Sequence, residues 1–223
     1  INLSTNKVGR KEYLDKVDFL FEGVHKVFIS EKKRQDWGLK GDVVLPGLDI
    51  AEYGGYRGDR ETVLQVGNLL QERDLMMGYS VSKRIIGTHP LTTLGLNPSI
   101  PGSRLSEGFQ DLIENFRSSR VFINTTVEEF EDGYNLSMLE AMATGMPVIS
   151  SANKSSPIID GKNGYISNDI KYLNQRIDFL LRNPDEARKL GEKAKETVKE
   201  KFPLTRFLQS WRRVIEKSAL DYL

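Results

Sequence analysis

The chain has 223 residues, of which 39% are hydrophobic and 28% are charged, with a mean hydropathy of −0.42. This length allows one good-sized soluble domain, alone or with a remnant of another. The 32 basic and 31 acidic side chains give a net charge of +1, which excludes a global positive field for nucleic acid. The absence of cysteine excludes disulfides and thiolate catalysis, and two histidines are too few for a histidine-rich zinc site.

Hydropathy and the first residues bear on location. No apolar run reaches the roughly 20 residues that a membrane-spanning helix needs. The chain begins with Ile1 rather than methionine and shows no signal peptide, so we expect a trimmed or partial chain. The lack of cysteine fits a reducing compartment. We therefore expect a cytoplasmic protein, with a peripheral position at a membrane as the alternative.

The beginning of the chain predicts a short α/β fragment. A charged amphipathic segment at 11–21 precedes an apolar strand at 26–30 and a basic helix at 31–37. Residues 43–49 are expected to form a second strand that ends in a Pro-Gly turn. Glycines and tyrosines fill 51–59, which we interpret as a flexible connection between domains.

From residue 62 onward, apolar strands alternate with helical patterns. The expected strands lie at 62–68, 91–96, 120–124, 147–149 and 165–166, and further helical patterns lie at 69–86, 105–116, 176–181, 187–198 and 207–220. This alternation predicts βαβ crossovers and a mainly parallel sheet. Ligands bind beyond the carboxyl ends of such strands, so we expect a site in the loops after Val66, Ile123 and Ile149.

Residues 131–149 form the most informative stretch of the chain. They predict an acidic turn, a short helix closed by Gly145 and a buried strand that opens at Pro147. The first-turn amides and the positive end of the helix dipole would form an anion site. The alternative is that Asp132 or Asn135 only caps the helix.

Glu140 is the second candidate side chain of this stretch. It lies one helical turn after Leu136, at the rim of an apolar stripe that we expect from Leu136, Leu139 and Ala143. A carboxylate in that position can point into the same crevice as the acidic turn. The alternative is an ordinary solvated helix residue.

The loop after the strand at 62–68 carries a third signal. Gly67 allows a tight turn, and Arg73 follows six residues later, where a guanidinium could clamp a diphosphate. The alternative is a surface arginine. Gly-x-Gly-x-x-Gly and Walker spacings are absent after this strand, and no Gly-x-Ser-x-Gly elbow occurs. We interpret His25 and His89 as structural.

Residues 132–149 resemble the signature of the retaining glycosyltransferases with the GT-B fold, a group that includes relatives of sucrose and glycogen synthases. The family pattern is Glu-Gly-Phe-Gly-Leu-x-x-x-Glu-Ala-Met-Ala-x-Gly-x-Pro-Val. Asp132 stands at the first acid, residues 133–136 at the glycine-rich turn and Glu140 at the second acid. The half from Glu140 to Val148 matches almost without change.

The resemblance extends from about residue 43 to the end of the chain. Residues 43–49 are similar to the strand and Asn-Gly-Val-Asp turn before the family's second domain. Residues 66–69 with Arg73 resemble its Val-Gly-Arg-Leu loop, and 160–164 match its Asp-Gly-x-Asn-Gly turn. The implied fold is α/β, a Rossmann-like parallel sheet that forms the C-terminal half of GT-B and is abbreviated by one βα unit.

The resemblance also implies a division of the chain. Residues 1–50 would be a remnant of the N-terminal acceptor-side domain, and 51–205 the Rossmann-like domain that binds a nucleotide sugar. Residues 206–223 would form a helix that packs back toward the N-terminal part. Most of the acceptor half would then be absent, either lost by truncation or supplied by a partner.

By the same resemblance, Glu140 would hydrogen-bond the ribose of the donor and Arg73 would hold its diphosphate. Asp132 would approach the transferred sugar, and Arg73 and Asp132 would be the catalytic residues. The implied donor-binding residues are Gly67, Asn68, Arg73, Gly133, Tyr134, Asn135, Leu136 and Glu140. The donor would be a UDP- or GDP-sugar, with no cofactor and no metal, because cations and a helix N-terminus stabilise the leaving group.

The sequence departs from the family pattern at several positions. Asp132 replaces a glutamate, with Glu131 as the alternative acid, and Asn68 replaces an arginine, which removes one phosphate cation. No acid stands near residues 156–157, before the late turn. The segment between Gly67 and Leu94 has room for only one helix, hence the expected loss of a βα unit.

Despite these departures, the resemblance predicts the donor-binding part of a retaining glycosyltransferase. A non-catalytic nucleotide-sugar-binding or assembly subunit is the alternative, favoured by Asn68 and the missing late acid. An epimerase of the same fold is a third possibility, which the two poorly placed histidines disfavour. The expected partners are a nucleotide-sugar donor, a carbohydrate, lipid-linked or protein acceptor of unknown identity, and the missing N-terminal half or a separate acceptor domain, but no nucleic acid.

Overall fold

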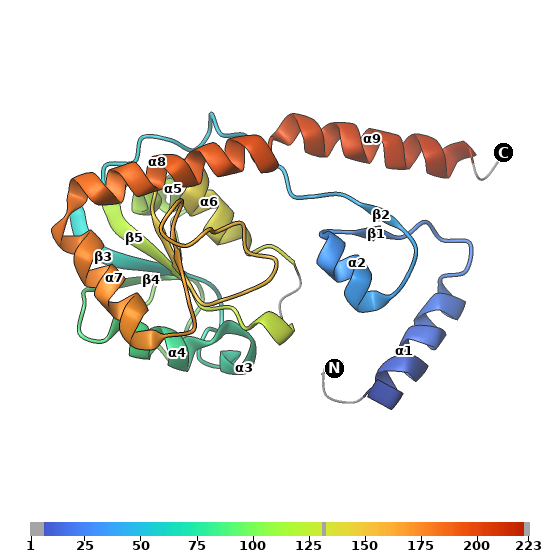
Figure 1. The fold of residues 1–223 in the computed structure, drawn as a ribbon, viewed down its shortest axis with the longest axis horizontal. Coiled ribbons are helices and arrows are strands. Elements are labelled where there is room, and N and C mark those ends of the chain that lie inside the picture. Colours follow the sequence, from blue (N-terminus) through green and yellow to red (C-terminus); the bar gives the residue numbers. More distant parts are fainter. Residues whose placement is uncertain (1–6, 131–132, 221–223) are drawn as a thin grey trace.

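The main body of the protein is a parallel sheet, seen in a computed structural model that describes residues 7–130 and 133–220 (Figure 1). The sheet has five strands in the order β4-β3-β5-β6-β7, and each neighbouring pair is parallel. The strands are β3 (Arg60–Val66), β4 (Leu91–Leu94), β5 (Ser119–Asn124), β6 (Val148–Ser150) and β7 (Tyr165–Ile166). The expected mainly parallel α/β sheet is therefore confirmed.

Helices cover both faces of this sheet. Alternate residues of a strand point to opposite faces, so Val63 and Val121 pack with α4 (Tyr79–Ile86) and α7 (Ile170–Arg182). The opposite face buries another set of strand residues against α5 (Phe109–Ser118), α6 (Leu136–Thr144) and α8 (Pro184–Lys201), among them Leu64, Phe122 and Val148. Burial on both faces explains why the central strands read as nearly continuous apolar runs.

The crossover from β3 to β4 differs from the single helix that the sequence predicts. It contains α3 (Asp74–Met77) and then α4, separated at Gly78, which has a φ of +62°. A Cβ at Gly78 would overlap the carbonyl oxygen of Thr125. The break thus comes from the close approach of a neighbouring loop, which the apolar pattern of the segment does not encode.

The N-terminal part forms a small layer beside the main body. It consists of α1 (Lys7–Leu20), α2 (Glu31–Trp37) and a parallel pair of strands, β1 (Val27–Phe28) and β2 (Asp42–Val43). The strand expected at 43–49 is wrong beyond Val43. Backbone groups of that segment instead reach the far end of the chain.

Two distant segments cross where the small layer meets the main body. Leu48 donates its amide to the carbonyl of Phe202 at 2.9 Å, and Leu204 donates to the carbonyl of Leu48 at 3.1 Å. The helix α9 (Leu204–Leu220) begins at this crossing and extends beside the small layer (Figure 1). Asp42 links α9 to the small layer, since its carboxylate lies 2.6 Å from His25 and 3.3 Å from Lys217 of α9.

Residues 51–59, which we expected to form a flexible connection, are fixed on the main body. Tyr53 is buried in the core of the face that holds α5 and α6. The hydroxyl of Tyr56 donates to the carbonyl of Arg120 at 2.7 Å, and the amide of Arg57 donates to the carbonyl of Arg117 at 2.8 Å. The division at residues 50 and 205 stays a prediction.

Gly191 gives a direct test of how α8 packs on α6. A Cβ at Gly191 would overlap the carbonyl oxygen of Gly145, the residue that ends α6. Gly191→Ala should therefore lower the free energy of unfolding by roughly 1–3 kcal/mol, although alanine favours an isolated helix. Urea denaturation followed by circular dichroism measures this. Lys189→Ala, on the exposed surface of the same helix, is the control, and equal stability of both variants would contradict the packing.

Candidate functional site

The loops after β3 and β5 meet at the carboxyl edge of the sheet. The hydroxyl of Thr125 donates to the carbonyl of Met77 at 2.9 Å, and the amide of Val127 donates to the carbonyl of Met76 at the same distance. These bonds attach α3, which follows β3, to the segment that follows β5. The two segments therefore form one continuous edge.

Thr126 joins the loop after β6 and the start of α6 to this edge. The side-chain amide of Asn135 lies 3.4 Å from the hydroxyl oxygen of Thr126, which donates to Asn124 at 2.8 Å. The hydroxyl of Ser151, after β6, lies 3.4 Å from the carbonyl oxygen of Thr126. All three loops expected at the ligand-binding edge thus come together.

The loop after β3 has an unusual backbone. Leu69 has a φ of +52°, a region that residues other than glycine rarely occupy and that is often found at functional sites. The buried side chain of Asn97 holds the loop: it accepts from the amide of Leu70 and donates to the carbonyl of Gly67, each at 2.8 Å. No local pattern in the sequence marks Asn97, because its partners lie far away along the chain.

Asn68 and Arg73 differ in what their side chains contact. Asn68 accepts a hydrogen bond from the amide of Leu96 at 2.8 Å, so its oxygen braces the loop after β4. Arg73 is exposed at the start of α3 and makes no side-chain hydrogen bond or ion pair within residues 7–130 and 133–220. The arginine is therefore the cation of this loop that an anion could engage.

The start of α6 carries a side-chain cap. Asn135 is the N-cap, and its side chain accepts from the amide of Met138 at 2.8 Å, so the capping interpretation holds for this residue. The helix ends at Gly145, with a φ of +94°, as expected. Of the residues expected in the apolar stripe, Leu139 and Ala143 are buried, whereas Leu136 is 55% exposed.

The turn before α6 contacts the small N-terminal layer. Gly133 has a φ of +141°, and a Cβ there would overlap the side chain of Ile29. Tyr134 packs edge-on against Phe202, with 4.9 Å between ring centroids. The acid Asp132 and its alternative Glu131 lie outside the described residues, so their roles stay predictions.

Glu140 is half-buried on α6 and is not an ordinary solvated residue. Its Oε1 accepts a hydrogen bond from the hydroxyl of Tyr53 at 3.1 Å. Burial raises the pKa of the Glu140 carboxyl, while the bond from Tyr53 opposes that rise. The resulting contribution to stability is present below the unfolded-state pKa of about 4.3 and is lost as the pH rises through the folded-state pKa. Burial likewise raises the pKa of Tyr53.

A metal-binding cluster and a membrane-spanning helix are both missing from the described residues. The described part of the chain has no group of three or more histidine, aspartate or glutamate side chains placed to hold a metal ion. Among the helices that the structure describes, none combines the length and apolar character needed to cross a bilayer.

Replacement of Tyr53 by phenylalanine tests the contact with Glu140. Tyr53→Phe should raise the pKa of Glu140 further, because the variant loses a hydrogen bond that favours the carboxylate. Carbon-13 NMR titration of the glutamate carboxyls measures the change. Tyr56→Phe removes a hydroxyl that donates to a backbone carbonyl and should leave Glu140 unchanged. Identical Glu140 titrations in wild type and Tyr53→Phe would show that the contact is absent.

Known proteins resemble the chain in both sequence and fold. A trehalose synthase from Pyrococcus horikoshii is 31% identical over 97 residues, which are 43% of this chain and 23% of that protein. A poly(ribitol-phosphate) α-N-acetylglucosaminyltransferase from Staphylococcus aureus is 33% identical over 107 residues, 46% of this chain and 20% of that protein. The chain therefore matches less than a quarter of the length of these curated relatives.

A solved structure and a family profile also match this chain. HepE of Anabaena, solved with UDP-glucose, has a TM-score of 0.74 at 13% identity, over 97% of this chain and 70% of HepE. The profile described as glycosyl transferases group 1 matches residues 66–183, more than half of the chain. The parallel sheet, the convergent loops and this match together place the chain in the glycosyl transferases group 1 family, with the fold of the C-terminal half of a GT-B glycosyltransferase.

Proposed function

We propose that this chain is the donor-binding part of a retaining glycosyltransferase that uses a UDP- or GDP-sugar. The observation that carries the proposal is the network at Thr125–Val127, which holds the Arg73 loop against the start of α6. A cation and helix amides at one sheet edge suit a diphosphate. HepE, which was also solved with UDP, supports a nucleotide donor for the shared fold.

Arg73 and the start of α6 would hold the diphosphate. Arg73 has no partner among the described side chains, so its guanidinium can bind a phosphate bidentately without breaking an existing ion pair. The amide of Met138 is taken by Asn135. The earlier first-turn amides, at Leu136 and Ser137, have no acceptor within the helix and are the donors that a phosphate would use.

Glu140 would bind the ribose. The Oε1 of Glu140 accepts a hydrogen bond from Tyr53, whereas the Oε2 of Glu140 makes no hydrogen bond with the described residues. One carboxylate oxygen of Glu140 can therefore accept from a ribose hydroxyl. Tyr53 at the same time fixes the direction of the carboxylate. This geometry would place the nucleoside along α6 and the diphosphate near its first turn.

The reaction would depend on stabilisation of the leaving group. The bond between the anomeric carbon and the β-phosphate oxygen breaks, and negative charge develops on the nucleoside diphosphate. Arg73 and the α6 amides would stabilise that charge, and we propose that this site works without a metal. The acceptor hydroxyl bonds to the anomeric carbon on the face from which the phosphate departs and loses its proton to that phosphate. Asp132 would lie beside the transferred sugar.

A non-catalytic nucleotide-sugar-binding subunit is the second candidate. It is favoured by Asn68, whose side-chain oxygen is engaged by Leu96 and supplies no cation to the diphosphate. Both candidates predict donor binding, so turnover separates them. If the chain, supplied with an acceptor-binding half, binds a UDP-sugar but neither transfers nor hydrolyses it, the binding subunit is the better account.

Arg73→Ala tests the diphosphate site. The variant should bind UDP about tenfold to a hundredfold more weakly, because it loses a charge-assisted, bidentate hydrogen bond. Isothermal titration calorimetry measures the affinity. Arg84→Ala, an exposed arginine on α4, is the matched control and should bind like the wild type. Equal affinity of both variants for UDP would remove Arg73 from the site.

Glu140→Gln tests the ribose contact. The substitution should lower the affinity for UDP by about tenfold. It should lower the affinity for dUDP, which lacks the ribose 2′-hydroxyl, by less. Comparing both ligands separates a lost contact to that hydroxyl from a general loss of structure. Glu186→Gln, on the exposed surface of α8, is the control. Equal losses for UDP and dUDP would contradict a Glu140 contact to the 2′-hydroxyl.

A further inference from the structure

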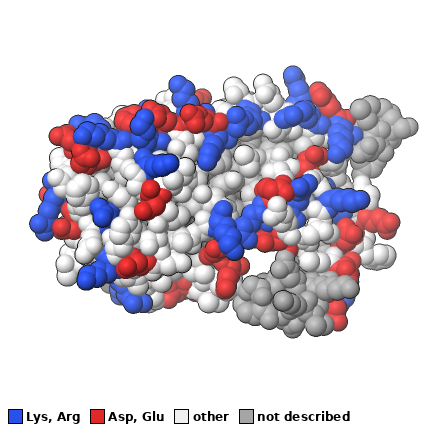
Figure 2. All heavy atoms as spheres, in the orientation of Figure 1, with Lys and Arg blue, Asp and Glu red and all other residues white. Residues whose placement is uncertain are grey.

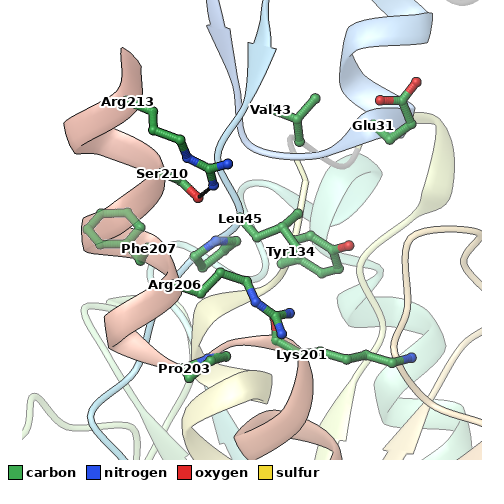
Figure 3. Close-up of a pocket in the computed structure, with 11 residues that line it drawn as sticks. Glu31, Val43, Leu45, Tyr134, Lys201, Pro203, Arg206, Phe207, Ser210 and Arg213 are labelled. Atoms are coloured by element: carbon green, nitrogen blue, oxygen red, sulfur yellow. Dashed lines mark hydrogen bonds between the residues drawn. The ribbon is translucent and has the colours of Figure 1, made fainter. Parts of the chain in front are cut away.

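A cavity of about 440 Å³ lies between α9 and the small N-terminal layer, next to the proposed donor site, with which it shares Tyr134 (Figure 3). Val43 and Leu45, from β2 and the segment after it, line its side toward the small layer, and Phe207 lies on its α9 side. A volume of this size accommodates a small molecule. The apolar side chains suit a carbon skeleton.

Three cations of the described part of the chain line this cavity. Arg206 and Arg213 reach into it from α9, and Lys201 is the last residue of α8 (Figure 3). Their hydrogen bonds go to neutral groups: Arg206 donates to the carbonyl of Lys201 at 3.2 Å, and Arg213 donates to the hydroxyl of Ser210 at 3.3 Å. None of the three forms an ion pair with a carboxylate in the part of the chain that the structure describes.

Among the residues that the structure describes, one carboxylate, that of Glu31, also lines the cavity. Its Oε1 already accepts hydrogen bonds from Arg34 at 2.7 Å and from Gln35 at 3.1 Å. The bond from Arg34 and then that from Gln35 lower the pKa of Glu31, so it is ionised and balanced by its own helix. The described lining of the cavity thus keeps an excess of positive charge, in a protein whose net charge is only +1.

A second cavity lies toward the proposed donor turn. This smaller cavity, of about 260 Å³, shares Glu31, Tyr134 and Lys201 with the first and adds Lys32 and Lys154. Lys32 is already paired with Asp36 at 3.0 Å, and Lys154 with Glu128 at 3.2 Å. Tyr134 directly follows Gly133, in the turn before α6. Lysine and arginine side chains lie over both α2 and α9 in Figure 2. A ligand in the larger cavity would therefore lie beside the place where sugar transfer is proposed.

We propose that this cavity binds a phosphate ester on the acceptor, so that the acceptor is a phosphorylated sugar or polyol. The inference rests on the proposed function, because it names the molecule that receives the sugar. Two guanidiniums match a phosphate dianion bidentately, and a lysine adds a point charge. The apolar side chains of Val43 and Leu45 would contact the carbon chain of the same molecule.

The test uses glycerol 3-phosphate as the probe and nitrogen-15 NMR of the full chain with saturating UDP. The probe should shift the amide signals of residues 201–213 and leave those of 67–73 at their UDP-bound positions. Arg206→Gln/Arg213→Gln should weaken probe binding by about tenfold or more and leave UDP affinity unchanged. Arg212→Gln is the control, since Arg212 lies on α9 outside the cavity and near Glu216. Wild-type mapping decides the site even if the double variant fails to fold.

Other outcomes would overturn the inference in distinguishable ways. If glycerate binds as tightly as glycerol 3-phosphate, the cavity does not select phosphate. If the probe only competes with UDP and Arg73→Ala abolishes its binding, it occupies the donor site, and the proposed function survives without this inference. If phosphatidylglycerol vesicles bind through Arg206 and Arg213 but glycerol 3-phosphate does not, the surface contacts a membrane. If neither UDP nor the probe binds, both proposals fail.

Discussion

The burial of the parallel sheet on both faces is the constraint on which the rest of the structure depends. Parallel strands need crossover helices, and those helices cover both faces, so Val63 and Leu64 are fully buried on opposite sides of β3. Every strand of the sheet consequently ends at the same edge. The loops that follow β3, β5 and β6 have no other place to meet, and the site is a consequence of that topology.

Polar contacts then convert this convergence into a defined geometry. Thr125 bonds to the backbone of α3 and Thr126 to the side chain at the start of α6, while the side chain of Asn97 holds the loop after β3. Glu140 is directed by Tyr53 from a segment far away in sequence. The donor proposal therefore rests on the loops and on Glu140, which their neighbours hold in place. Without these groups beside it, Arg73 would be only a surface arginine.

Patterns local in sequence predicted much of this structure. Asn135 and Gly145 mark the ends of α6 because a cap and a left-handed residue are local requirements, and the alternation of strands and helices predicted the parallel sheet. Contacts between distant segments were not predictable: the Tyr53 bond, the role of Asn97 and the break at Gly78 each depend on a distant partner. Helical periodicity likewise does not tell which residue of an apolar stripe stays exposed, as Leu136 does.

The central claim is that the loop after β3 and the start of α6 form one nucleoside diphosphate site. A crystal structure of this chain grown with UDP tests it most directly. The account predicts the diphosphate between Arg73 and the first turn of α6, with the ribose against Glu140. UDP bound elsewhere, with Arg73 still free in solvent, would contradict it.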